Sequence, residues 1–302
     1  MELNESAQID TSQVEDRRRS GGGGLGGMPI PIPTGRGGLI GTLITVVLLL
    51  IGGGLVGTNM MDDGGDNTSI EQQCAANNPD RLNQPECRNV LFINSINAYW
   101  ADALPRTFGQ PYQTAKTVFF SQAVNTGCGA ADAGVGPFYC PPDHEAYIDL
   151  TFWNELARRF GAEGEFAQAY VLAHEYGHHV QALLGTDAQV RRAQERDPGN
   201  ANKYSVMLEL QADCFAGVWS KNATQTTDAG GQPIFRSITQ ADIDQALDAA
   251  AAVGDDTIQR KSGGPVDESQ FTHGTAAQRQ QWFGRGFQNG DGRSCDTFGN
   301  AV

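Results

Sequence analysis

One segment of this chain limits its architecture more than any other: residues 38–57 (GLIGTLITVVLLLIGGGLVG) contain no charged residue. A helix of about 20 apolar residues spans the roughly 30 Å hydrocarbon core of a bilayer. A buried helix of a soluble domain normally shows a polar stripe, which this segment lacks. A cleaved signal peptide usually has a shorter apolar region nearer the N-terminus, although the small residues that end this one would allow cleavage. We therefore predict a single transmembrane helix over residues 38–57.

Charge on either side predicts the orientation of this helix. Four arginines precede it, between residues 17 and 36, and the acidic sequence MMDDGGD follows it. Basic residues next to a membrane helix favour the cytoplasmic side. We therefore expect a cytoplasmic N-terminus and a large periplasmic or extracellular part, anchored by a single pass through the inner or plasma membrane.

The net charge of −14 argues against a nucleic-acid partner, because a phosphate backbone binds a basic surface. Residues 1–37 hold five acidic and four basic residues, a net of −1, so the part after the apolar segment carries −13. Residues 1–37 are rich in Gly, Pro and charge and predict a disordered cytoplasmic segment. Residues 58–70 are expected to be a short polar linker, and residues 71–302 the folded domain.

All six cysteines follow the apolar segment. An even number confined to one part of the chain is typical of an oxidising compartment. Cys74–Cys87 and Cys128–Cys140 would close short local loops. The pair Cys214–Cys295 would then tie the C-terminus to the core. Unpaired thiols are the alternative, and a cysteine zinc site is disfavoured because no C-x-x-C pair occurs.

The rest of the chain shows mainly helical periodicity. Apolar residues recur three and four apart over residues 165–184, and Gly185 ends the pattern, which predicts a long helix. Thr239 and Asp242 are spaced as in a helix cap. Residues 145–150 (EAYIDL) alternate and predict a short strand. Further helices are predicted at residues 152–160, 204–219, 239–253 and 276–287. We expect a mostly helical domain with a short sheet.

The helix predicted at residues 165–184 contains an H-E-x-x-H motif, formed by His174, Glu175 and His178. Residues four apart lie on one face of a helix, so both imidazoles can bind one zinc ion. Glu175 is the next residue along the helix after His174. Its carboxylate can take a proton from a water bound to the metal. Zinc lowers the pKa of such a water to about 7, so a carboxylate base suffices near neutral pH.

A helix with ordinary surface or core histidines is the alternative, since three fixed positions in five residues also match by chance. Three of the five histidines of the chain cluster here, within apolar flanks. Gly177 permits another element to approach closely. His179 points away from the metal face and is expected to support the ligands or to pack. His144 is expected in a surface loop.

A catalytic zinc site needs a third protein ligand and one open position. A histidine six residues after His178 would indicate a metzincin, but residue 184 is Leu. Glu209 and Asp213 lie four apart in the apolar segment SVMLELQADCFAGVW, and buried carboxylates need a partner or a metal. We expect Glu209 to bind zinc and Asp213 to hold a ligand imidazole by its free N–H. An exposed, solvated face is the alternative.

His273, in FTHGTAAQRQQWF, is either a rival third ligand or a donor to the tetrahedral oxyanion, and an ordinary helix-start histidine is the alternative. Arg279, Tyr204 and Tyr176 are further candidate donors. The strand predicted at residues 145–150 is the nearest candidate for an edge strand that holds a peptide substrate by strand addition.

Four segments give the chain a resemblance to a known family: GPFYCPPD, YIDLTFWNELARRFGAEGEFAQAYVLAHEYGHHVQ, SVMLELQADCFAGVW and HGTAAQRQQWF. With them, from the arginine run to the C-terminus, the chain resembles the putative neutral zinc metallopeptidase family of bacterial membrane-anchored proteins, which is itself similar to gluzincins. The resemblance implies a compact α+β, zincin-like fold. It also implies the roles of five residues: His174, His178 and Glu209 as zinc ligands, Glu175 as general base, and Asp213 as an acid that supports the ligands without binding the metal.

These features together predict a zinc-dependent peptidase that acts on peptides or unfolded protein segments outside the cytoplasmic membrane. The alternative is a catalytically silent, membrane-tethered zinc domain that binds an envelope partner. A zinc hydrolase of non-peptide amides would use the same residues. Glu175 argues against a silent domain, because a structural site has no use for a general base. The oligomeric state has no signature in the sequence.

Overall fold

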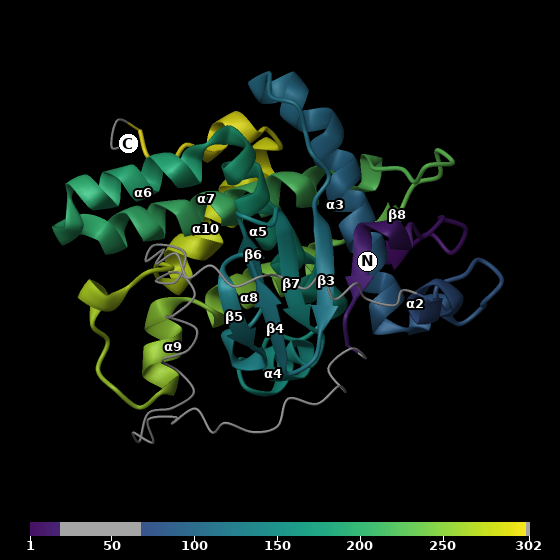
Figure 1. The fold of residues 1–302 in the computed structure, drawn as a ribbon, viewed down its shortest axis with the longest axis horizontal. Helices are drawn as coiled ribbons and strands as arrows, with labels where there is room; N and C mark the ends of the chain where they lie inside the picture. Colours follow the sequence, from purple (N-terminus) through teal and green to yellow (C-terminus); the bar gives the residue numbers. More distant parts are fainter. Residues whose placement is uncertain (19–67, 300–302) are drawn as a thin grey trace.

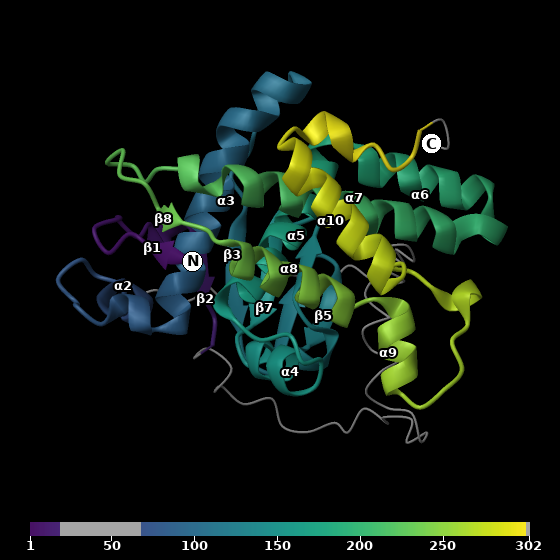
Figure 2. The same ribbon diagram turned by 180° about the vertical axis from the view of Figure 1, so that it is seen from behind.

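The computed structural model describes residues 1–18 and 68–299. In Figure 1 the long helix α5 (Glu165–Leu184) runs through the middle of the molecule, between a small sheet and a group of helices. That group includes α7 (Ala201–Asn222) and α8 (Gln240–Ala252), which both pack on α5. Seen from behind, α10 (Ala276–Asn289) lies along α7 (Figure 2). On its other side α5 contacts α3 (Pro85–Phe108). The fold is mixed, with helices dominant, as predicted.

Shorter elements complete the described part. The further α-helices are α2 (Thr68–Gln73), α4 (Phe152–Arg158), α6 (Thr186–Arg196) and α9 (Asp255–Lys261). The strands are β1 (Glu2–Leu3), β2 (Val14–Asp16), β3 (Lys116–Phe120), β4 (Ala123–Thr126), β5 (Gly129–Asp132), β6 (Phe138–Cys140), β7 (Glu145–Asp149) and β8 (Phe235–Ser237).

The main sheet has the strand order β2-β3-β7-β6. β2, β3 and β7 run parallel, and β6 runs antiparallel to β7. β7 confirms the strand predicted at residues 145–150, but it lies inside the sheet, so the expectation that it forms the edge is wrong. The edge strand next to β7 is β6, because a tight turn folds the chain back on itself just before β7. His144, in this turn, has a left-handed backbone (φ 56°).

Local sequence signals locate the other predicted helices to within three residues at each end. α5 ends at Gly185, whose left-handed backbone (φ 73°) caps the helix. Thr239 and Asp242 form the capping box of α8. The sequence pattern does not predict helix α3. It buries polar residues such as Asn89 and Asn94 among apolar ones, so its sequence shows no single apolar stripe.

All three predicted disulfides are present: Cys74–Cys87, Cys128–Cys140 and Cys214–Cys295. The first ties the segment after α2 to α3, and the second holds the end of the edge strand β6. The third joins α7 to the C-terminal segment. The first two therefore clamp local loops, and the third links parts of the chain that are distant in sequence.

Residues 1–18 are ordered and belong to the domain, so the expectation of disorder is wrong for this part of residues 1–37. β1 pairs with β8 and β2 pairs with β3. Ala7 is fully buried, and Arg81 donates to the backbone oxygens of Glu5 and Ala7. Composition predicts disorder because this segment is too short and too polar to form a core of its own. The segment is ordered because it packs on a core formed by the rest of the chain.

The transmembrane helix predicted at residues 38–57 lies outside the described residues, as do residues 19–37 and 58–67. Among the helices formed by residues 1–18 and 68–299, none combines the length and the apolar character needed to cross a membrane.

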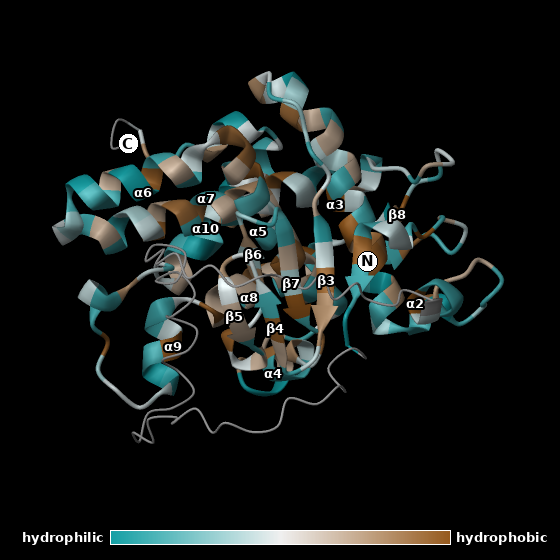
Figure 3. Cartoon of the chain, in the orientation of Figure 1, coloured by the Kyte–Doolittle hydropathy of each residue, from teal (hydrophilic) through white to brown (hydrophobic). Residues whose placement is uncertain are grey.

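The core lies where the sheet and α3 meet α5 and α7. Large side chains that are less than 2% exposed fill it, among them Trp100, Phe166, Phe215 and Trp219. In Figure 3 apolar residues gather on these inner elements, whereas much of α6 and α9 is hydrophilic. The core therefore holds α5, the helix with the H-E-x-x-H motif, on several sides.

Candidate metal centre

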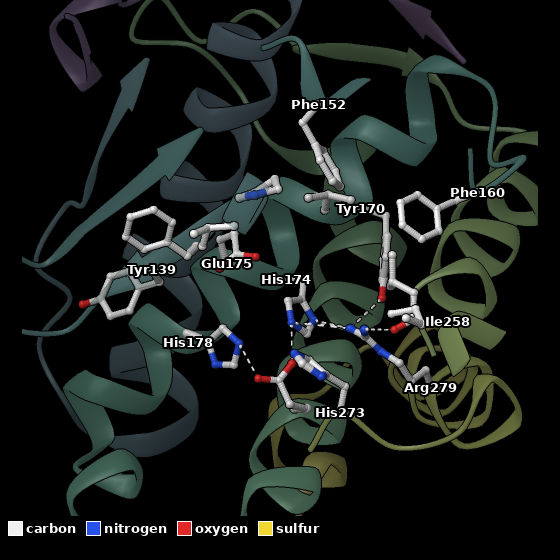
Figure 4. Close-up of a pocket in the computed structure, with 16 residues that line it drawn as sticks. Tyr139, Phe152, Phe160, Tyr170, His174, Glu175, His178, Ile258, His273 and Arg279 are labelled. Carbon is white, nitrogen blue, oxygen red and sulfur yellow. Dashed lines mark hydrogen bonds and ion pairs between the residues drawn. The ribbon is translucent and has the colours of Figure 1, made fainter. Parts of the chain in front are cut away.

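Three side chains meet between α5 and α7. His174 and His178 project from one face of α5, and Glu209 projects from α7. Their ligand atoms all lie within 4.8 Å of one another. The Nε2 atoms of His174 and His178 are 3.1 Å and 3.4 Å from the two carboxylate oxygens of Glu209. In Figure 4 the two imidazole rings lie next to each other at this point.

The close packing of α7 on α5 brings Glu209 within reach of the histidines. A Cβ atom on Gly177 would lie 2.9 Å from the backbone of Ala212 on α7, so only glycine fits there. Ala212 lies about one helical turn after Glu209. The contact at Gly177 therefore sets the distance between the carboxylate and both imidazoles.

Each imidazole is held through its other nitrogen. His174 Nδ1 donates to Asp213 Oδ1 at 2.8 Å, and His178 Nδ1 donates to Gln181 Oε1 at 2.8 Å. In its neutral form each ring then presents an unprotonated Nε2 atom to Glu209, as a metal ligand must. Two imidazoles and one carboxylate are a donor set that catalytic zinc takes in proteins.

Asp213 stays ionised because a buried arginine pairs with it. Arg279 donates from Nε and Nη2 to the two carboxylate oxygens at 2.8 Å and 2.9 Å. The Tyr170 hydroxyl donates to Oδ1 at 2.5 Å. Burial alone would raise the pKa of Asp213, but Arg279 and His174 lower it to about 2. Asp213 is therefore a fixed, charged acceptor for His174.

The electrostatics of the centre favour a cation. Burial opposes the ionisation of Glu209, but His178 and His273 hold its pKa well below the usual range. Burial also disfavours the charged form of His174, yet Asp213 raises its pKa to about 9. The negative charge thus draws a proton onto a ligand histidine. A divalent cation would satisfy the same charge, so the residues fit zinc in charge as well as in geometry.

Glu175 lines the cavity above the ligands, one step round α5. Its side chain is buried, and this burial raises its pKa against the opposing effect of His174 and His178. A carboxylate whose pKa is shifted toward neutral is suited to act as a general base.

His273 reaches the same cavity from the loop before α10. Asp255 holds this loop, since one carboxylate oxygen accepts the backbone N–H groups of residues 272–274. The other oxygen lies 3.2 Å from His273 Nδ1. Burial disfavours the charged form of His273, but Glu209 and Asp255 raise its pKa overall. His273 is outside the ligand cluster, so the role of donor fits it better than that of rival ligand.

The cavity has a volume of about 120 Å³. Figure 4 shows how aromatic and aliphatic side chains surround the polar group. Its apolar walls are Val135, Pro137, Phe138, Tyr139, Phe152, Phe160, Val171, Val253 and Ile258. A second cavity of about 50 Å³ lies beyond His178 and Glu209, among α5, α6 and α7. Tyr139 lines both cavities.

Two of the predicted oxyanion donors do not reach the cavity. The Tyr176 hydroxyl is buried and lies 3.1 Å from that of Thr117. The Tyr204 hydroxyl is 3.4 Å from Asp197. Arg279 does line the cavity, although Asp213 engages its guanidinium.

Sequence reasoning missed Asp255, Gln181 and Tyr139. Gln181 lies three residues after His178, so helical spacing alone could have pointed to it. Asp255 and Tyr139 reach the site from distant parts of the chain, and no local pattern marks them.

Comparison with known proteins identifies relatives over nearly the whole chain. A family model described as putative neutral zinc metallopeptidase matches residues 4–298. The chain is 41% identical over 295 residues to the uncharacterized protein YpfJ of Escherichia coli, covering 97% of this chain and 98% of that protein. It is 48% identical over 218 residues to the uncharacterized protein Rv2575 of Mycobacterium tuberculosis, covering 72% and 71%. No solved structure matches it.

Proposed function

The chain belongs to the putative neutral zinc metallopeptidase family, and we propose that it is a zinc-dependent peptidase that hydrolyses peptide bonds. One observation carries the proposal: a His–His–Glu ligand set, a buried carboxylate and a histidine donor all line a single cavity. A structural zinc site would need only the ligands.

His174, His178 and Glu209 would hold the zinc ion, which when bound polarises the scissile carbonyl and acidifies the attacking water. Glu175 takes the proton of this water as general base. Because burial raises the pKa of Glu175, its carboxyl group retains this proton until the leaving amine accepts it.

His273 would stabilise the developing oxyanion. Its Nδ1 atom faces Asp255, which leaves Nε2 as the donor toward the cavity. The raised pKa of His273 favours the form that carries this proton. A donor held in place before the reaction stabilises the transition state without reorganisation.

The substrate would lie along β6, the edge strand of the main sheet whose residues line the cavity. Phe138 and Tyr139 of this strand line the cavity. An extended peptide can add to such an edge through backbone hydrogen bonds, while apolar walls such as Phe152 and Phe160 receive its side chains. This proposal replaces residues 145–150 as the substrate-binding strand.

The domain would act outside the cytoplasm. Three disulfides support this location, because disulfides persist in oxidising compartments. The alternative function, a silent zinc domain that binds an envelope partner, gives no role to Glu175 or to the Asp255–His273 pair.

The test uses the full chain, purified with its disulfides intact, beside Glu175→Gln and Glu209→Ala. We expect the parent to bind about one zinc ion and to cleave an unfolded protein. Glu175→Gln should keep zinc and lose cleavage by about a thousandfold, because only the base is removed. Glu209→Ala should lose zinc. Metal analysis and a fluorescent casein assay provide the measurements.

A parent that binds zinc but cuts nothing in a broad peptide library would favour the silent domain. Cleavage that survives Glu175→Gln would refute the proposed mechanism.

A further inference from the structure

His179 follows the second ligand on α5 and is completely buried, yet it takes no part in the ligand set. Its Nε2 atom lies 2.6 Å from the backbone oxygen of Gln113. A carbonyl oxygen only accepts, so Nε2 carries the proton and Nδ1 of the neutral ring is an acceptor. The Tyr139 hydroxyl donates to this Nδ1 at 2.9 Å. Both ring nitrogens are therefore hydrogen-bonded to residues outside α5, Gln113 and Tyr139.

Tyr139 belongs to the edge strand β6 and stands between the two cavities beside the ligands. Its hydroxyl also lies 3.3 Å from Nδ1 of His144, in the turn that leads to β7. Since the hydroxyl proton goes to His179, the oxygen accepts from His144. The helical turn that presents His178 is thus tied to both the edge strand and its turn.

The ring of His179 has little freedom to move. The rings of Tyr112 and Tyr139 each lie 5.4 Å from it, centre to centre. Packing and two hydrogen bonds therefore fix its orientation, and through it the position of Tyr139.

We propose that His179 is a positioning residue for peptide binding, which holds β6 through Tyr139 at a set distance from the metal ligands. A peptide paired with β6 would then present its scissile bond at the metal. This inference deepens the proposed function and rests on it.

The test compares two probes on the zinc-loaded full chain by calorimetry. Acetohydroxamate reaches only the metal, whereas a tripeptide hydroxamate also reaches β6. Tyr139→Phe removes one hydroxyl and keeps the ring, and His179→Phe removes both hydrogen bonds. We expect each to weaken the tripeptide probe about tenfold and to leave acetohydroxamate within about twofold.

Tyr112→Phe is the matched control. Its ring packs on His179, but its hydroxyl donates to Asn97 of α3 at 2.6 Å and not to His179 or β6. Both probes should bind this variant as they bind the parent.

Each outcome decides the inference. If the parent prefers the tripeptide probe and both variants keep this preference, the positioning role is overturned while the peptidase proposal stands. If the parent itself shows no preference, peptide binding along β6 is refuted and the inference falls with it. Equal weakening of both probes would mean that the variants disturb the metal site, and this too would overturn the inference.

A different observation carries a second inference: residues 1–18 are built into the domain. β2 pairs with β3 in parallel register. The Asp10 backbone N–H donates to the Asn94 side chain at 2.9 Å, and Asn94 donates to the Asp10 carbonyl at 3.0 Å. Arg18 bridges Asp16 at 2.7 Å and Glu86 at 2.8 Å.

Buried groups of the main domain depend on this segment. Arg81 is only 6% exposed, and its guanidinium donates to the backbone oxygens of Glu5 and Ala7. Asn94 is equally buried. A buried guanidinium that loses its acceptors is strongly unfavourable. The native domain therefore requires residues 1–18 in place.

We infer that residues 1–18 and residues 68–299 lie on the same side of any membrane that the chain meets. A single crossing at residues 38–57 would put them on opposite sides and separate partners that the structure joins. If it holds, this inference replaces both the single crossing expected at residues 38–57 and the cytoplasmic N-terminus expected from the arginines. Since the disulfides indicate an oxidising compartment, both parts lie outside the cytoplasm.

Thiol labelling of the full chain in intact bacterial cells tests this inference. All six native cysteines are paired in disulfides, so a membrane-impermeant maleimide reacts only with an introduced thiol. Ser6→Cys places a thiol at an exposed position in the N-terminal segment, and Ser121→Cys places one at an exposed position in the main domain.

Both variants should react before lysis. Labelling of both only after lysis would keep them on one side, but inside the cytoplasm, and would overturn the stated compartment. Labelling of Ser121→Cys in intact cells and of Ser6→Cys only after lysis would overturn the inference itself.

Discussion

At the scale of single residues, the centre contains two pairs in which a buried carboxylate orients an imidazole. Asp213 holds His174, a proposed ligand, and Asp255 holds His273, the proposed donor. Each carboxylate has other partners that keep it in place: Arg279 for Asp213, and three backbone N–H groups for Asp255. The two pairs serve different tasks, so substitutions should separate metal binding from turnover.

The variants Asp213→Asn and Asp255→Asn test this separation. Asp213→Asn should weaken zinc binding by about 10–100-fold, because the orienting acceptor of a ligand is lost. It should also lower stability, because Arg279 loses its charged partner. Asp255→Asn should keep zinc affinity and lower kcat by about tenfold or more. Zinc competition with a chelator and steady-state kinetics measure the two effects. Similar zinc loss in both variants would contradict the division of tasks.

At the scale of elements, two close helix contacts shape the site. Gly177 lets α7 approach α5, which brings Glu209 to the histidines. On the other face of α7, Gly217 and Gly286 let α10 approach, and α10 carries Arg279 to Asp213. The positions of Glu209, the third proposed ligand, and of Arg279 therefore both depend on how closely α7 packs against its neighbours.

Gly286→Ala and Gly284→Ala form a matched pair on α10. A Cβ atom at residue 286 would lie 2.0 Å from the carbonyl oxygen of Cys214, whereas one at residue 284 meets nothing within 4 Å. We expect Gly286→Ala to destabilise the protein by about 2–3 kcal/mol through overpacking. Gly284→Ala should stabilise it by up to about 1 kcal/mol, because alanine favours the helix. Urea unfolding measures both changes. A stabilising effect of both would show that α7 and α10 are not in close contact.

At the scale of the whole molecule, the domain is assembled from both sides of the apolar segment. The N-terminal residues extend the main sheet beside β3 and pair with β8 near α8. The Cys214–Cys295 disulfide ties the opposite end of the chain to α7. Segments far apart in sequence thus share one core, and a change near residue 7 should destabilise the entire fold.

Ala7→Asp and Ser6→Asp test this expectation on the full chain. Ala7 is fully buried, whereas its neighbour Ser6 is exposed. A charge at residue 7 should cost about 3 kcal/mol or more, and a charge at residue 6 should change stability by about 0.5 kcal/mol at most. The midpoint of urea unfolding gives both values. Equal, small effects would mean that the N-terminal segment contributes nothing to the stability of the domain.

The sequence by itself determined what depends on local pattern. Apolar periodicity and Gly185 set the bounds of α5, and the spacing of His174 and His178 on one helical face follows from those bounds. Short loops between cysteines predicted two disulfides, and elimination predicted the third. The segment around Glu209 suggested a buried acid because its neighbours are apolar.

Only the tertiary structure decided what depends on contacts between distant segments. The edge position of β6 follows from the order of strands in the sheet, and strand order leaves no trace in a single strand's sequence. Asp255 meets His273, and Tyr139 meets His179, only after the chain has folded. The docking of residues 1–18 could not be predicted either, because it also depends on contacts with segments that are distant in sequence. A short segment that docks on a core formed by the rest of the chain needs no periodicity of its own. Its contacts with that core offset the conformational entropy that it loses on ordering.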